Sequence, residues 1–285
     1  MKLNQFITVV ILTAFIFSCS SNKKPENNSF AGSDRITLHQ EFKKYFDECN
    51  TEGSIAIYDN SKHEWILSDT VGIFKETLPA STFKIINLLI ALETNTITDE
   101  NEVMKWNGNT DTVKYGYRPE INHDMTVKEA FKVSAVWAFI DLARKIGKEN
   151  YKKYLTLCSY GNLDLSQTDD DFWNFGAFAV SPLNQVEFLK KMYEGKLPFS
   201  KRNIEIVKNV MQTEQEANYT IYAKTGWTRE GGINTGWWVG YIENKNGTYF
   251  FATRLLQDRK FKSANFGNCR KEITRKIFRD LKIIE

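Results

Sequence analysis

Apolar residues cluster into strand-like runs near both ends of the chain. These runs predict strands at residues 53–58, 64–67, 220–225, 236–243 and 248–255. A short polar stretch separates the first pair, and Asn246-Gly247, which is typical of tight turns, separates the last pair, so a hairpin is expected at each place. Near the C-terminus, Ile273, Ile277 and Leu281 recur at helical spacing and predict a final helix.

The middle of the chain has the periodicity of helices. Helices are predicted at residues 83–92, 126–133, 136–146 and 182–193. Thr126 and Glu129 have the spacing of a capping box, and Gly147 is placed to end the helix before it. Strands around a helical middle predict an α+β fold. We expect an antiparallel sheet completed by both termini and flanked by helices, with a helical subdomain inserted at about 85–215 and a cleft between them.

The predicted helix at 83–92 contains a charge that an ordinary buried helix lacks. Nearly every position from Phe83 to Leu92 is apolar except Lys84 and Asn87, which leaves no polar stripe to face water. A buried ammonium without a partner is so unfavourable that the lysine pairs with an anion, loses its proton or reacts. Lys84 is therefore the first candidate functional residue.

Ser81 stands three residues before Lys84, at the start of the same predicted helix. One helical turn brings the amine beside the hydroxyl, and the first-turn N–H groups point toward any oxyanion that develops there. A desolvated, neutral lysine can take the serine proton or capture carbon dioxide as a carbamate. The Ser-x-x-Lys spacing alone is a weak signal, since it occurs twice more between residues 20 and 24. A salt-bridged or snorkelling lysine is the alternative.

Two further motifs follow in chain order. Ser134-Ala135-Val136 lies between two predicted helices, where its serine could relay a proton. Lys224-Thr225-Gly226 ends a predicted strand and offers a cation and a hydroxyl to an anionic substrate, while the glycine permits close approach to the backbone. Each motif alone could be a helix junction, a rim charge or a turn. The ordered combination favours a catalytic site.

The N-terminus predicts export. A lysine precedes an apolar run at residues 6–17, which is shorter than the ~20 residues of a membrane span and suits a signal peptide. Residues 1–19 are thus predicted to direct the protein to the periplasm. Cys19 resembles the acceptor of a bacterial lipoprotein, which would add a lipid anchor to the membrane; an ordinary cleaved signal is the alternative. Residues 20–35 are polar and are expected to tether the domain at 36–285.

Composition excludes several classes of function. The chain has 285 residues, of which 42% are hydrophobic, enough for a well-buried core. Its net charge of +3 arises from 38 basic and 35 acidic residues without a long basic run, so nucleic acid is not an expected partner. The histidines share no ligand spacing, and neither a metal site nor a serine–histidine triad is expected; they are His39, His63 and His123. Composition does not indicate the oligomeric state.

Apart from Cys19, the chain contains Cys49, Cys158 and Cys269. This is an odd number, so all of them cannot pair internally, and no Cys-x-x-Cys motif is present. Each cysteine is predicted to be a small buried hydrophobe.

Taken together, these motifs resemble the motif set of class D (oxacillinase-type) serine β-lactamases. The matching stretches are Ser81-Thr82-Phe83-Lys84, Ser134-Ala135-Val136, Tyr160-Gly161-Asn162, Trp173, Lys224-Thr225-Gly226 and Trp237-Trp238-Val239-Gly240. Class A enzymes carry Ser-Asp-Asn where this chain has Ser-Ala-Val. The resemblance runs from about Leu38 to the end of the chain and implies the fold of serine β-lactamases and penicillin-binding transpeptidases.

The resemblance implies how the reaction would proceed. Ser81 would attack a β-lactam carbonyl to give an acyl-enzyme, with the backbone N–H groups of Ser81 and Trp227 as the oxyanion hole. Lys84 would be N-carboxylated by carbon dioxide and act as general base in an apolar pocket made in part by Phe83 and Val136. No cofactor other than this carbamate is implied.

The resemblance also assigns roles to residues around the reacting atoms. Trp173 would hold the carbamate through its N–H. Ser134 would pass a proton to the leaving nitrogen, and Lys224 would tune this transfer electrostatically. Thr225 and Arg270 would bind the substrate carboxylate.

One position departs from the family pattern. Leucine usually follows the loop tryptophan, whereas this chain has Asn174. A polar side chain there is expected to affect water access or carbamate stability, which leaves the substrate spectrum, including carbapenems, open. Residues 160–162 are expected to shape the cleft wall without a chemical step.

Two alternatives share these motifs. A β-lactam sensor domain belongs to multi-span membrane proteins with a zinc protease segment, whereas this sequence has a short N-terminal apolar run and no His-Glu-x-x-His. A penicillin-binding DD-peptidase generally has Ser-x-Asn where this chain has Val136. The leading hypothesis is therefore a periplasmic class D β-lactamase, an enzyme whose partner is a small-molecule β-lactam.

Overall fold

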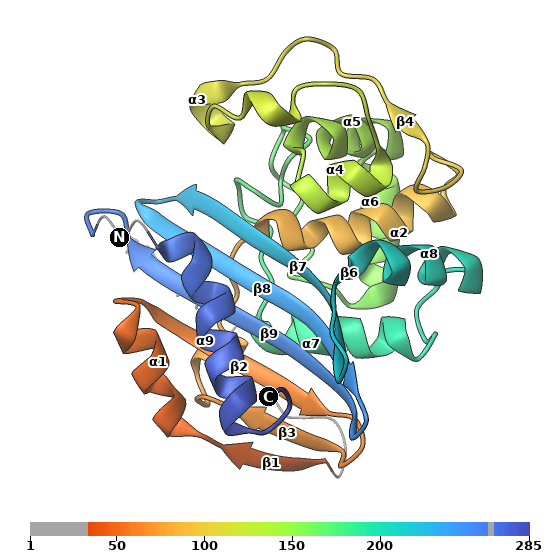
Figure 1. Ribbon diagram of the computed structural model, residues 1–285. Coiled ribbons are helices and arrows are strands. Elements are labelled where there is room, and N and C mark those ends of the chain that lie inside the picture. The colour runs from red at the N-terminus through yellow and green to blue at the C-terminus, as the bar shows by residue number, and fades with distance from the viewer. Residues whose placement is uncertain (1–33, 262–264) are drawn as a thin grey trace, which may run out of the picture. The chain divides into compact units, whose positions relative to one another are not determined.

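The sheet is built from both ends of the chain, as the apolar pattern predicts. The computed structural model, which describes residues 34–261 and 265–285, has a seven-stranded sheet in the order β1-β3-β2-β9-β8-β7-β6 (Figure 1). Its strands are β1 (Arg35–Leu38), β2 (Glu52–Asp59), β3 (Glu64–Leu67), β6 (Gln212–Gln215), β7 (Tyr219–Glu230), β8 (Ile233–Asn244) and β9 (Gly247–Asp258). All neighbours are antiparallel except β1 and β3, which pair in parallel. The sheet is therefore mixed rather than purely antiparallel.

Most of the α-helices lie in the sequence between β3 and β6. The helices of the described residues are α1 (Lys43–Glu48), α2 (Lys84–Glu93), α3 (Thr112–Tyr115), α4 (Val127–Val133), α5 (Val136–Ile146), α6 (Lys148–Cys158), α7 (Pro182–Tyr193), α8 (Lys201–Met211) and α9 (Phe266–Asp280). A small second sheet pairs β4 (Val103–Met104) with β5 (Met125–Thr126). The predicted helices are confirmed, including the cap of α4, where the Thr126 hydroxyl accepts a hydrogen bond from the Glu129 N–H at 3.2 Å.

Helices α6 and α8 were not predicted from the sequence. Their apolar residues lie at helical intervals among many lysines and asparagines; in α6 the buried positions are Tyr151, Tyr154, Leu155 and Cys158. The spacing of these residues was the available signal, and the polar composition obscured it. Both helices lie within the stretch predicted as the helical insertion.

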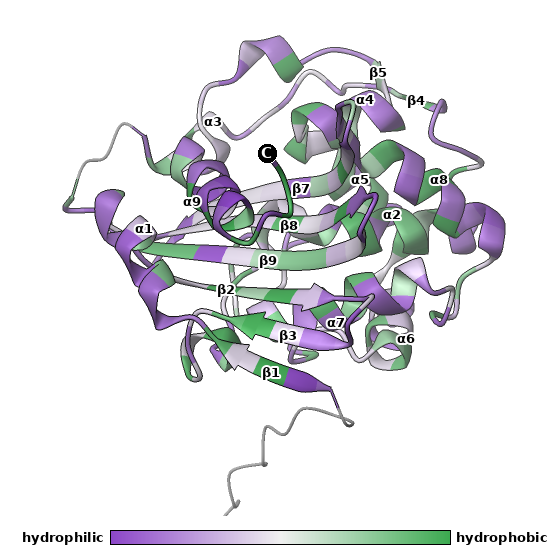
Figure 2. Ribbon diagram, turned by 60° about the horizontal axis from the view of Figure 1, so that its bottom comes forward, coloured by the Kyte–Doolittle hydropathy of each residue, from purple (hydrophilic) through white to green (hydrophobic). Residues whose placement is uncertain are grey.

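Opposite faces of the sheet are covered by α7 and α9. Phe250 packs against Tyr193 of α7 at 5.4 Å between ring centroids, whereas Phe251 packs against Phe278 of α9 at 5.1 Å. Consecutive residues of a strand point to opposite faces, so these contacts place one helix on each side. Apolar residues run along the middle of β9, while α9 carries polar residues on its outer surface (Figure 2).

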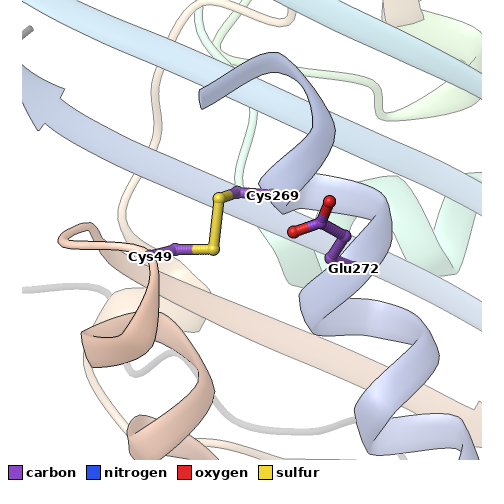
Figure 3. Close-up of side chains that lie close together, drawn as sticks. All are labelled: Cys49, Cys269 and Glu272. Atoms are coloured by element: carbon purple, nitrogen blue, oxygen red, sulfur yellow. A yellow bond between two sulfur atoms is a disulfide. The ribbon is translucent and has the colours of Figure 1, made fainter. Parts of the chain in front are cut away.

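A disulfide joins the first and last helices of the described chain. Cys49, at the end of α1, is bonded to Cys269 in the first turn of α9 (Figure 3). The sequence left the pairing of the cysteines open, and the default of a small buried hydrophobe does not describe this bonded pair. That default holds for Cys158, which is free and buried, and burial raises the pKa of its thiol to about 12.

The same helix places a carboxylate beside the disulfide. Within the described residues, Cys49, Cys269 and Glu272 bring possible metal-ligand atoms within 4.8 Å of one another (Figure 3). The two sulfur atoms are bonded to each other, so they are not the thiolates that bind metals. We therefore treat this group as a structural link between α1 and α9.

The predicted signal peptide, Cys19 and most of the tether lie outside the described residues. The first strand starts at Arg35, at the predicted boundary between tether and domain. Across residues 34–261 and 265–285, the model contains no helix with both the length and the apolar character needed to cross a bilayer. Export and lipidation remain predictions.

Loss of the disulfide is expected to destabilise the fold. Replacing Cys49 with alanine removes a disulfide between residues 220 positions apart. Because that bond restricts the unfolded chain, its loss should lower the free energy of unfolding by about 2–4 kcal/mol. Denaturant unfolding with and without a thiol reductant measures this effect. Reductant should destabilise the wild type and Cys158→Ala but leave Cys49→Ala unchanged; equal sensitivity in all three proteins would contradict the assignment.

Candidate active site

Ser81 is presented by a tight 3₁₀ turn at the start of α2. The turn, η3 (Ala80–Phe83), is closed by the Thr82 hydroxyl, which donates to the Pro79 carbonyl at 2.7 Å. Ala80 has a left-handed φ of 51°, which is unusual for a residue other than glycine. Its N–H donates to the Trp173 carbonyl at 2.9 Å, and this bond helps to hold the conformation that exposes Ser81.

Lys84 is completely buried next to this serine. Its Nζ donates a hydrogen bond to the Ser81 Oγ at 3.1 Å and lies 4.9 Å from the centre of the Phe139 ring. Among the described residues, no carboxylate forms an ion pair with it. Burial, and to a smaller extent the charge of Arg118, lowers the pKa of Lys84 to about 7. A large part of the amine is thus neutral near pH 7, as a base for Ser81 requires.

Trp173 lies in an aromatic cluster behind the nucleophile. Its indole stacks on Phe83 with 5.0 Å between ring centroids and is fully buried. Its Nε1–H has no hydrogen-bond partner among the described residues. A buried donor of this kind usually has a partner, so this N–H is available to donate to an acceptor group.

The serine of the second motif meets the lysine of the third. Ser134 ends α4 in the left-handed region, with φ of 58°, and its Oγ accepts a hydrogen bond from the Lys224 Nζ. Lys224 also donates to the Thr225 carbonyl at 3.1 Å. Burial and then the charges of Lys84 and Arg270 hold the pKa of Lys224 well below its ordinary value. The pair can therefore pass a proton.

Strand β7 supplies an open edge to the site. It pairs with β6 only through residues 220–222, so residues 224–230 have a strand neighbour on one side only. One face of this segment packs on the Ser81 turn: a Cβ on Gly226 would come within 2.7 Å of the Pro79 carbonyl oxygen and 3.1 Å of Thr82. A side chain at this position would push the strand and the nucleophile apart.

Arg270 reaches the same strand from α9. Its guanidinium donates to the carbonyls of Gly226 and, at 2.7 Å, Gly267. Burial lowers the pKa of Arg270 to about 10, so the side chain is a cation near neutral pH. It directly follows Cys269, and the disulfide therefore fixes the turn of helix that carries it.

A cleft of about 470 Å³ joins these groups. The predicted site residues that line it are Ser81, Ser134, Val136, Thr225, Gly226, Trp227 and Arg270. The other three, Lys84, Trp173 and Lys224, are buried. All ten predicted residues thus come from distant parts of the chain to one place.

The structure adds to the expectations about the site and corrects one of them. The Phe139 ring lies 4.9 Å from the amine and joins the predicted apolar pocket, in which Phe83 is buried and stacks on Trp173. Phe139 stands one helical turn after Val136 and could have been found from that spacing. Tyr160 is not part of the cleft wall: it is buried behind the nucleophile, and its hydroxyl donates to Gln185 at 3.0 Å.

The unusual residue Asn174 does line the cleft. It is 7% exposed, and its carbonyl accepts a hydrogen bond from the Thr228 hydroxyl, which ties the loop to β7. Its Nδ2 has no partner among the described residues. The cleft therefore has an amide where the family pattern has an apolar side chain.

Comparison with known proteins agrees with this geometry. Residues 46–279 match the family described as penicillin binding protein transpeptidase domain. The chain is 37% identical to β-lactamase OXA-10 of Pseudomonas aeruginosa over 87% of this chain and 90% of that protein, and 33% identical to OXA-48 of Klebsiella pneumoniae over 86% and 89%. A class D β-lactamase structure from Sebaldella termitidis matches with a TM-score of 0.83 and 39% identity, covering 89% of this chain and all of that one.

The fold is thus that of serine β-lactamases and penicillin-binding transpeptidases. Within it, the chain belongs to the class D serine β-lactamases, a family of hydrolases.

The buried amine should make stability depend on pH. The pKa of Lys84 falls from an ordinary 10.5 to about 7 on folding, so between these values the unfolded chain binds a proton that the folded chain does not. The free energy of unfolding should therefore rise with pH across this window, by up to about 1.4 kcal/mol per pH unit.

Lys84→Met lacks this titration and is the matched control. Urea unfolding of both proteins in bicarbonate-free buffer should show the wild type gaining stability relative to the variant from pH 7 to 10.5. Parallel pH profiles of the two proteins would mean that the pKa of Lys84 is not lowered on folding.

Proposed function

We propose that the protein hydrolyses β-lactam antibiotics through an acyl-enzyme on Ser81. The single observation that carries the proposal is the fully buried Lys84 amine at 3.1 Å from the Ser81 hydroxyl, with its pKa lowered to about 7. Membership in a family of β-lactamases supports the choice of substrate. The reaction is acyl transfer to serine, followed by transfer to water.

Acylation uses the groups around the cleft. Lys84 removes the Ser81 proton as the oxygen attacks the lactam carbonyl carbon. The oxyanion is stabilised by the backbone N–H groups of Ser81 and Trp227. As the carbon–nitrogen bond breaks, Ser134 gives its proton to the leaving nitrogen and receives one from Lys224, to which it is hydrogen-bonded. Lys84 then loses its extra proton to solvent and Lys224 regains one. In the second half-reaction, neutral Lys84 takes a proton from water as the water oxygen attacks the acyl carbon, and returns it to the Ser81 oxygen as the ester bond breaks, which releases the product acid.

The substrate carboxylate has a place beside this centre. Thr225 offers a hydroxyl and Arg270 a guanidinium whose donors lie at the level of Gly226 on β7. A guanidinium binds a carboxylate with paired hydrogen bonds. This contact would orient the lactam ring so that its carbonyl faces Ser81.

The site also fits carbon dioxide bound to Lys84. The amine is neutral enough to react near pH 7, its surroundings are apolar, and the buried Trp173 N–H lacks a partner that a carbamate oxygen would supply. When bound, the group supplies a carboxylate-like general base for both half-reactions. Lys84 and Trp173 are the residues that would hold it.

The place of action is proposed from the sequence alone. Residues 1–19 have the pattern of a signal peptide, and Cys19 that of a lipoprotein acceptor. We therefore propose that the enzyme works in the periplasm, with a lipid anchor if Cys19 is modified.

The function is tested by stopped-flow kinetics with a chromogenic cephalosporin in bicarbonate buffer. We expect sustained turnover by the wild type and neither burst nor turnover by Ser81→Ala. Lys84→Met should lose turnover, and wild-type activity should fall when bicarbonate is removed at low pH. A burst of one equivalent that then stalls would overturn hydrolysis in favour of a β-lactam sensor or a penicillin-binding DD-peptidase.

Trp173→Phe separates the two half-reactions. The substitution retains the ring that stacks on Phe83 at 5.0 Å but removes the unpaired N–H. We expect deacylation to slow by about 10–100-fold and acylation to change less, because a hydrogen bond to a charged group typically contributes ~1.5–3 kcal/mol.

Mass spectrometry should then detect persistent acyl-enzyme, and ¹³C NMR with labelled bicarbonate should show a weaker carbamate signal. Trp137→Phe is the control, since the Trp137 N–H already donates to the Ile121 carbonyl at 2.7 Å. An unchanged carbamate signal in Trp173→Phe would remove Trp173 from this role.

A further inference from the structure

The charged residues that line the cleft are all cations. They are Lys114, Arg118, Lys132, Arg229 and Arg270, and no aspartate or glutamate of the described residues lines it. The chain as a whole is nearly balanced, with 38 basic and 35 acidic residues. The residues that line the cleft therefore favour an anionic ligand.

Two of these cations already have anionic partners. Lys114 forms ion pairs with Asp169 at 2.9 Å and Asp171 at 3.1 Å. Arg118 pairs with Glu120 at 3.0 Å. In the proposed function, Arg270 binds the substrate carboxylate. The remaining cations, Lys132 and Arg229, have no carboxylate partner among the described residues.

Arg229 is held in place by aromatic stacking. Its guanidinium carbon lies 4.8 Å from the centre of the Trp227 ring. Trp227 is itself fixed, because its Nε1 donates to Asn234 at 3.2 Å and its ring packs on Phe266 at 5.4 Å. The Arg229 guanidinium forms no side-chain hydrogen bond or ion pair with the described residues, so its N–H donors are available for bidentate binding of an anion.

The order of groups along β7 indicates which anion this would be. Thr225, Trp227 and Arg229 alternate onto one face of the strand, with Arg229 about 13 Å beyond Thr225. Gly226 faces the opposite side of the strand, where it contacts the Ser81 turn. The cleft borders both sides at this edge of β7, since Ser81 and Arg229 both line it. A β-lactam has its carboxylate at one end, the reacting carbonyl in the middle and the acyl side chain at the other end. With the carboxylate at Thr225 and the carbonyl at Ser81, the acyl side chain extends toward Arg229.

We propose that Arg229 binds a second anionic group, a carboxylate or sulfonate, on the acyl side chain, so that the enzyme favours dianionic β-lactams. This inference rests on the proposed hydrolysis at Ser81. It concerns substrate preference, and the residues that carry out the reaction remain as described. Lys132 adds positive potential to the cleft, but it lies at the end of α4 and does not share the face of β7.

The test compares two penicillins that differ by one carboxylate. Benzylpenicillin and α-carboxybenzylpenicillin share the ring system and the phenyl side chain. The ratio of kcat/KM for α-carboxybenzylpenicillin to kcat/KM for benzylpenicillin therefore isolates the effect of the second charge. Arg229→Gln should lower this ratio by about tenfold, mainly through KM for the dianion, as expected for loss of a charge-assisted hydrogen bond. Arg229→Lys should restore part of the loss, since it keeps the charge but not the fork.

Lys132→Gln is the matched control for the general field of the cleft. It removes an unpaired cation of the same cleft and should change the ratio much less than Arg229→Gln does. A ratio that is unchanged in Arg229→Gln, or that falls equally in both variants, would overturn the inference while hydrolysis of benzylpenicillin still supports the proposed function. Failure of the wild type to hydrolyse either penicillin would refute both.

Discussion

The structure depends on keeping one lysine out of water. Lys84 lies three residues after Ser81, on a helix whose side chains are buried on nearly all sides, and no anion among the described residues compensates its charge. Transfer of an ammonium into such surroundings is unfavourable, and the amine responds by losing its proton at a much lower pH. In the proposed function this amine is the base near pH 7. Its burial lowers the stability of the fold, and the surrounding core must offset that cost.

The surrounding elements serve this arrangement in different ways. The ring of Phe139 from α5 lies against the amine, and the Phe83–Trp173 cluster fills the space behind the nucleophile. Strand β7 approaches the Ser81 turn so closely that only glycine fits at position 226. Helix α9 brings Arg270 to this strand, and the disulfide anchors the beginning of that helix. Each contact joins parts of the chain that are far apart in sequence.

The candidate active site contains several positively charged side chains. Lys84 and Lys224 lie beneath a cleft whose charged lining residues are cations, and their mutual repulsion contributes to the lowered pKa of Lys224. The same field attracts anions from solution and favours charge that develops on a carbonyl oxygen. The cations of the site repel one another, and the same positive charges attract an anionic substrate in the proposed function.

The sequence by itself predicted the central strands β2, β3, β7, β8 and β9, but not the edge strands β1 and β6, and it predicted the helices α2, α4, α5, α7 and α9. It also supplied the candidates for the reacting groups. Apolar periodicity is a property of neighbouring residues, so it could be read directly for the sheet and for helices such as α5 and α7. Motif order also pointed to Ser81, Lys84, Ser134 and Lys224, because the chemistry of nucleophile, base and proton relay demands those residue types.

Only the tertiary structure decided which side chains meet. Packing between distant elements pairs Cys49 with Cys269 across 220 residues. It also brings the Phe139 ring to the Lys84 amine. The parallel pairing of β1 with β3 was likewise decided there. Sequence periodicity does not predict these contacts, because they depend on how helices and strands pack together and not on which residues are neighbours in the chain.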